Sequence, residues 1–152
     1  MALKLSKVFD QHQVILADYG EIPHISTAKY SLLSLGSRNE NTLAHQLLTC
    51  CLDEGVEMII PLHEFELSPL QSAALLFEEF NIHLALPAAL SDYRQPERGN
   101  MKNWFFIWKG AILFSSNPDA HPEPFAPDEQ LSGAFYLAED PQGVAKLKLI
   151  TI

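Results

Sequence analysis

The stretch that decides the fold runs from Val56 to Leu67 and reads VEMIIPLHEFEL. Its first half is a short apolar run that ends at Pro61, which is typical of a strand buried on both faces. A helix is expected next, because Ser68 is a favourable cap, Pro69 suits the first helical position and Gln71 completes a capping box. The stretch therefore predicts a buried strand that leads into a helix.

The segments on either side repeat this alternation of strand and helix. Apolar runs predict strands at Val14–Ala17, Tyr30–Leu35 and Ile82–Leu86, and helical periodicity predicts a helix over Thr42–Glu54 that ends at Gly55. The helix after Ser68 should bury one stripe of side chains and end at Asn81. That stripe comprises Leu70, Ala73, Ala74, Phe77 and Phe80. Such alternation is the signature of βαβ units, so we expect an α/β fold with a parallel sheet, a reduced Rossmann-like three-layer unit.

The pattern changes after Pro87. Residues 91–102 are polar and predict a linker, and residues 116–129 are rich in proline and acids and predict a loop. Two β-hairpins are expected, one around Lys109-Gly110 and one around the turn at residues 140–143. We therefore expect an α/β unit over 1–90, a linker over 91–102 and a mainly antiparallel β extension over 103–152, packed on the same sheet.

Composition narrows the classes of function. The chain has 152 residues, of which 47% are apolar, and a formal net charge of −9. No Lys and Arg stripe is available to contact phosphates, so we expect no nucleic-acid partner. Apolar runs fall short of the roughly 20 residues that a membrane helix needs, and no leader is apparent, so we expect no membrane partner and a cytoplasmic location. Cys50 and Cys51 are neighbours and cannot join distant parts of the fold.

The segment 14–87 resembles the N-terminal pre-ATP-grasp domain of ATP-grasp carboxylate–amine ligases. The resemblance rests on the run VILAD ending at Asp18, the segment Ala28-Lys29-Tyr30, the stretch 56–67, and FEEFNI over 77–82. It implies a Rossmann-like fold and an ancestry in ATP-dependent ligation. It also implies one more strand at the start, for which the twelve residues before Gln13 leave no room. We expect the apolar run Leu147–Ile152 to insert in the gap, since unpaired backbone inside a sheet is costly.

The rest of the family's machinery is absent from this sequence. Residues 88–152 contain no Gly-rich phosphate loop and no Walker pattern, so ATP chemistry is not expected of this chain alone. Residues 104–149 are also similar, more weakly, to the non-catalytic N-terminal domain of NADH pyrophosphatases, without a Nudix box. We therefore expect no catalytic residue, no cofactor and no metal.

The best candidate site lies at the carboxyl ends of the parallel strands, where open sheets bind ligands. Asp18 and Tyr19 follow one strand, and His63, Glu64 and Glu66 follow another. Carboxylates and imidazole suit an ammonium group or a divalent cation. The alternative is that Glu66 only stabilises the start of the helix.

Two classes of function remain open. The first is a non-catalytic domain that binds a small carboxylate, an amino acid, a protein partner or a second copy of itself. The second is the substrate-side subunit of a split ATP-dependent carboxylate–amine ligase. The aromatic residues of 104–114 are expected in a core rather than on a partner surface.

Overall fold

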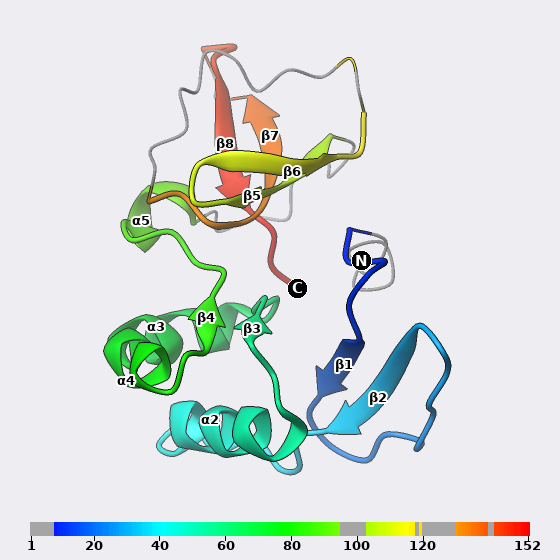
Figure 1. Cartoon of the computed structure of the whole chain (residues 1–152). Helices are drawn as coiled ribbons and strands as arrows, with labels where there is room; N and C mark the ends of the chain where they lie inside the picture. The colour runs from blue at the N-terminus through cyan, green and yellow to red at the C-terminus, as the bar shows by residue number, and fades with distance from the viewer. Residues whose placement is uncertain (1–7, 95–102, 118, 120–129, 140–141) are drawn as a thin grey trace. The chain divides into compact units, whose positions relative to one another are not determined.

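The computed structural model describes residues 8–94, 103–117, 119, 130–139 and 142–152. The chain divides into two compact units, Met1–Val56 and Glu57–Ile152, whose elements are labelled in Figure 1. This division falls inside the segment 1–90 that the sequence assigned to one α/β unit. Most of the expected linker over 91–102 lies outside the described residues.

The first unit contains two parallel strands and one helix. Strand β1 (Val14–Asp18) pairs with β2 (Tyr30–Ser34) in register along all five residues, from Val14 beside Tyr30 to Asp18 beside Ser34. Helix α2 (Leu43–Glu54) follows, and its buried stripe is Leu43, Leu47, Leu48 and Cys51. Gly55 ends the helix at φ 65°, a left-handed conformation that glycine adopts without steric cost. These elements confirm the sequence predictions for residues 14–55.

The second unit begins with a strand–helix–strand segment. Strands β3 (Met58–Ile59) and β4 (His83–Leu84) pair in parallel, as expected, but each is only two residues long. Between them lie helices α3 (Glu64–Ser72) and α4 (Ala74–Glu79), and the short helix α5 (Leu90–Tyr93) follows β4. The structure thus breaks at Ala73 what the sequence predicted as one helix. Asn81 does end the helical region, at φ 58°.

The predicted start of this helix at Ser68 is wrong. Helix α3 begins at Glu64, and Pro69 lies inside it. The reason is local hydrogen bonding: the Glu66 carboxylate accepts a hydrogen bond from the backbone N–H of His63 at 3.3 Å, so the capping interaction forms more than one turn earlier than expected. Gln71, the presumed capping partner of Ser68, donates instead to the carbonyl of Ala88 at 2.7 Å.

The larger sheet of the second unit is antiparallel. Strands β5 (Trp104–Trp108), β6 (Ala111–Ser115), β7 (Gly133–Glu139) and β8 (Ala145–Leu149) lie in the order β6-β5-β7-β8. Lys109 and Gly110, at φ 46° and 78°, form the turn between β5 and β6. Both expected hairpins are therefore confirmed, although residues 140–141 of the second turn lie outside the described residues.

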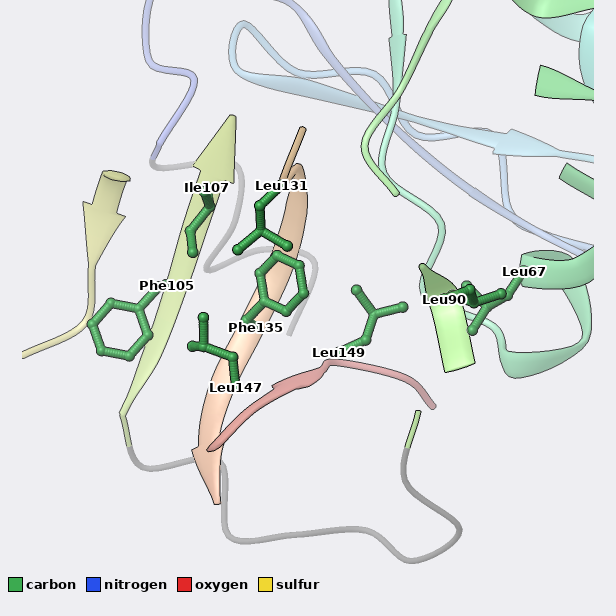
Figure 2. Close-up of a cluster of buried hydrophobic side chains, with 8 residues drawn as sticks. All are labelled: Leu67, Leu90, Phe105, Ile107, Leu131, Phe135, Leu147 and Leu149. Atoms are coloured by element: carbon green, nitrogen blue, oxygen red, sulfur yellow. The ribbon is translucent and has the colours of Figure 1, made fainter. Parts of the chain in front are cut away.

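One hydrophobic core joins this sheet to the helices of its own unit. Figure 2 shows its side chains, which come from α3, α5, three strands and the segment before β7. They are Leu67, Leu90, Phe105, Ile107, Leu131, Phe135, Leu147 and Leu149. Phe105 and Phe135 are completely buried, as is Phe106, while Phe80 of the expected helix stripe is 47% exposed. The β extension therefore packs on helices. Of its aromatic residues over 104–114, Trp104, Phe105 and Phe106 are buried as expected, whereas Trp108 and Phe114 are half-buried.

The expected insertion of Leu147–Ile152 into a parallel sheet is wrong. Leu149 pairs with Phe135 of β7, and the Ile150 N–H donates to the Ala134 carbonyl at 2.8 Å. A hairpin turn joins β7 to β8, so β7 is the nearest strand along the chain. Two strands joined by such a turn pair antiparallel. The ladders β1–β2 and β3–β4 remain separate two-stranded sheets. No described helix has the length and apolar character needed to cross a membrane.

Candidate functional site

The carboxyl ends of β1 and β2 are held together by a network of backbone and hydroxyl groups. The Leu35 N–H donates to the Asp18 carbonyl at 2.9 Å, and the Gly20 N–H donates to the Gly36 carbonyl at 2.8 Å. The Ser34 hydroxyl donates to the Gly20 carbonyl at 2.5 Å and accepts from the Gly36 N–H at 3.1 Å. This network fixes the loop that follows β2 against the segment that follows β1.

Asp18 itself is exposed at this edge of the ladder. Its carboxylate accepts a hydrogen bond from the backbone N–H of Tyr19 at 2.8 Å, and Tyr19 is half-buried. The structure therefore gives the Asp18 side chain a local role in the turn. Both residues lie at the strand end where the sequence placed them.

An open hollow of about 390 Å³ lies between the end of β2 and helix α2. We call it the β2–α2 hollow. Its lining residues are Leu33, Ser34, Leu35, Gln46, Thr49, Cys50, Asp53 and Glu54. All of them belong to the first unit. Among the residues that the structure describes, the lining includes two carboxylates and no Lys, Arg or His, so these residues favour a ligand that carries a positive charge.

Gln46 anchors the hollow at one end. Its side-chain amide donates to the Leu35 carbonyl and also lies 3.5 Å from the Ser37 carbonyl. Gly36 has φ 74°, and a Cβ there would meet the Gln46 amide nitrogen at 3.6 Å. A glycine at this position lets the loop take its left-handed conformation while the amide reaches the backbone. The wall of the hollow is thus preformed by the chain's own hydrogen bonds.

Cys50 is the one nucleophilic thiol in the lining, and its surroundings keep it protonated. Burial raises the pKa of the Cys50 thiol above its ordinary value of 9.0, and the carboxylates of Glu54 and Asp53 raise it further. Its neighbour Cys51 faces the core, where burial, and then the nearby Cys50, raise the pKa to about 12. Since the thiolate is the reactive form, neither cysteine is activated at neutral pH.

The second group of predicted site residues surrounds the start of α3. Glu66 is only 5% exposed, and its carboxylate accepts the His63 N–H described above. The His63 ring stacks on Phe65, with centroids 4.9 Å apart, and Glu64 forms an ion pair with Arg94 at 2.6 Å. Each of these side chains thus has a partner within its own unit, and Glu66 serves the helix start, the alternative raised from the sequence.

The predicted residues fall in different units. Asp18 and Tyr19 belong to the first unit, while His63, Glu64 and Glu66 belong to the second. Within the described ranges, no three His, Cys, Asp or Glu side chains come together in a way that could hold a metal ion. The hydrogen bonds and ion pair of the second group point to local structure as its main role.

Sequence reasoning missed the β2–α2 hollow. The sequence did carry one signal for the hollow. Gln46, Cys50 and Asp53 are spaced so that they share one face of α2, beside the buried stripe. What the sequence did not show is that the end of β2 lies against that face.

Comparisons with models of known families, with curated proteins and with solved structures find no match to this chain.

Proposed function

We propose that the chain is a non-catalytic domain that binds a small ligand carrying an amino group in the β2–α2 hollow. The observation that carries this proposal is the lining of the hollow: Asp53 and Glu54 supply negative charge, and none of the described lining residues is a cation. An amino acid or a simple amine fits this charge better than a free carboxylate, which the two acids would repel. The polar lining otherwise comes from Ser34, Gln46 and Thr49.

Two further features support a binding role without catalysis. The Cys50 thiol stays protonated, because burial and two nearby carboxylates raise its pKa. The lining residues that the structure describes also include no Lys or Arg, the side chains that hold nucleotide phosphates. ATP is accordingly not expected to bind there.

The proposal includes descent from a pre-ATP-grasp domain of reduced, Rossmann-like form. It is supported by the parallel ladders β1–β2 and β3–β4, and by the helices that follow β2 and β3. In a Rossmann-like sheet that has lost its central strand, two separate parallel ladders would remain.

A second candidate is the substrate-side subunit of a split carboxylate–amine ligase. It is favoured by the position of the hollow beside the carboxyl end of β2, where open parallel sheets bind substrates. On this alternative, the ligand would bind to the same hollow, and ATP hydrolysis would appear only when a separate ATP-grasp chain is added.

A thermal-shift series tests the proposal. The purified protein is heated with amino acids, simple amines, simple carboxylates or Mg-ATP. At a hundred times the dissociation constant a ligand adds about 2.7 kcal/mol, which corresponds to roughly 5 to 10 °C for a chain of this size. We expect that shift with compounds carrying an amino group and none with Mg-ATP.

Two variants locate the effect. Asp53→Asn removes one charge of the lining and should reduce the shift, while His45→Ala alters an exposed residue of α2 that does not line the hollow and should preserve it. A shift with Mg-ATP, or an amine shift that is equal in both variants, would contradict the proposal.

A further inference from the structure

Helix α2 ends with two acidic residues at a position that normally favours basic ones. The carboxyl end of a helix carries a partial negative charge, so a basic side chain stabilises the last turn and an acidic one destabilises it. Asp53 and Glu54 close α2, and its last turn contains no basic residue. Residues that break a local rule of stability in this way are typical of functional sites. The two carboxylates therefore call for a partner of positive charge.

The backbone at this end of α2 adds to the negative charge of the two side chains. The N–H groups of Gly55 and Val56 both donate to the carbonyl of Cys51, so both donors are directed at one carbonyl. The negative end of the helix dipole lies in the same turn as the two carboxylates. Their charge reaches the β2–α2 hollow, because Glu54 and Asp53, after burial, raise the pKa of the Cys50 thiol in its lining.

The size and lining of the hollow limit which amine satisfies both carboxylates. Its volume of about 390 Å³ lies in the range of sites that bind small molecules. A ligand with one ammonium group would leave a carboxylate without a partner, and the carboxylate of an amino acid would be repelled by both. A carbon chain with an ammonium group at each end meets the two charges and can also contact the apolar lining residues Leu33 and Leu35.

We propose that the β2–α2 hollow selects a linear diamine or polyamine over a monoamine or an amino acid. This inference rests on the proposed amine-binding function and narrows the class of its ligand. The two ammonium groups of the ligand neutralise Asp53 and Glu54, and its methylene groups lie against the apolar part of the lining. Binding thereby removes the destabilising charge from the end of α2.

Isothermal titration of the full chain at neutral pH and low ionic strength tests this selectivity with three probes of equal chain length. They are 1,4-diaminobutane, butylamine and 4-aminobutanoate. The diamine should have a dissociation constant at least about fivefold below that of butylamine, as expected for one further exposed ion pair. The amino acid should bind more weakly than butylamine. Equal binding of diamine and butylamine would overturn this inference alone, whereas no binding of any amine would overturn the proposed function as well.

A charge-matched pair of variants adds a readout that needs no ligand. Glu54→Gln should bring the dissociation constants of diamine and butylamine close together, while Glu21→Gln, an exposed position of the same unit outside the lining, should preserve their ratio. Without ligand, Glu54→Gln should also raise the midpoint of thermal unfolding by about 1–3 °C, because it relieves the end of α2. A lower midpoint, or an unchanged ratio of dissociation constants, would overturn the proposal.

Discussion

The two units of the chain differ in where they bury their apolar residues. In the second unit the strands form the core, since Phe105 of β5 and Phe135 of β7 are completely buried. In the first unit the core lies mostly on helix α2, and the equally apolar strand β1 stays half-exposed. The difference teaches that an apolar strand is not by itself a core strand: its burial depends on what packs on it. The second unit thus buries its apolar strands, whereas the first presents an open hollow and a half-exposed apolar strand.

The largest expected effect is on the core of the second unit. Phe135→Ala removes a fully buried ring from the cluster shown in Figure 2 and should lower the free energy of unfolding by about 3–5 kcal/mol. Leu75→Ala, at a position that is 77% exposed, should change it by less than about 0.5 kcal/mol. Urea unfolding measures both, and equal effects would refute the contrast between core and surface.

Native-state hydrogen exchange compares the two units directly. Amides of β2 should exchange on the order of 100-fold faster than those of β7, because the first unit has fewer buried strand residues and opens locally at lower free energy. Uniform protection across both strands would show that the chain opens only as a whole.

A pair of glutamate variants separates local structure from ligand binding at the start of α3. Glu66→Ala removes the buried carboxylate that accepts the His63 N–H and should cost about 0.5–2 kcal/mol of stability. Glu64→Gln breaks only an exposed ion pair with Arg94 and should cost no more than about 1 kcal/mol. If Glu66→Ala left stability unchanged and abolished ligand binding instead, the structural role assigned to Glu66 would be wrong.

Cys51 faces the core of the first unit, and we expect it to make the free energy of unfolding depend on pH in the alkaline range. Its pKa is raised from 9.0 to about 12 in the folded chain, so the folded state holds the thiol proton more tightly than the unfolded state does. The resulting stabilisation is complete below about pH 9 and is lost as the pH rises toward 12. The difference in unfolding free energy between the wild type and Cys51→Ala should therefore shrink over that range. A difference that stays constant with pH would contradict this assignment.

Local signals in the sequence predicted most of the elements but not their assembly. Gly55 marked the end of α2, and Lys109-Gly110 marked the first hairpin, because both need backbone conformations that few residues adopt. The start of α3 was misplaced because Ser68 and Pro69 form a strong local signal that the Glu66 hydrogen bond overrides. The resemblance to pre-ATP-grasp domains described in the sequence analysis remains a hypothesis about descent.

None of the residues that line the candidate site was predicted from the sequence, for a related reason. Sequence reasoning found the strand end at Asp18, since an apolar run that stops at an acid is a local feature. It missed the hollow beside Gln46 and Asp53, because that hollow depends on how the end of β2 meets α2. The spacing of residues within one helix or strand does not show which other element it contacts.

The most direct test of the central claim is a titration of the isotope-labelled protein followed by nuclear magnetic resonance, with amino acids, amines and Mg-ATP added in turn. We predict saturable shifts for compounds with an amino group, confined to the amides of residues 33–35 and 46–54 that border the hollow. Mg-ATP should leave those amides unchanged. Shifts centred on the start of α3, or saturable binding of Mg-ATP, would contradict the assignment of the β2–α2 hollow as an amine-binding site.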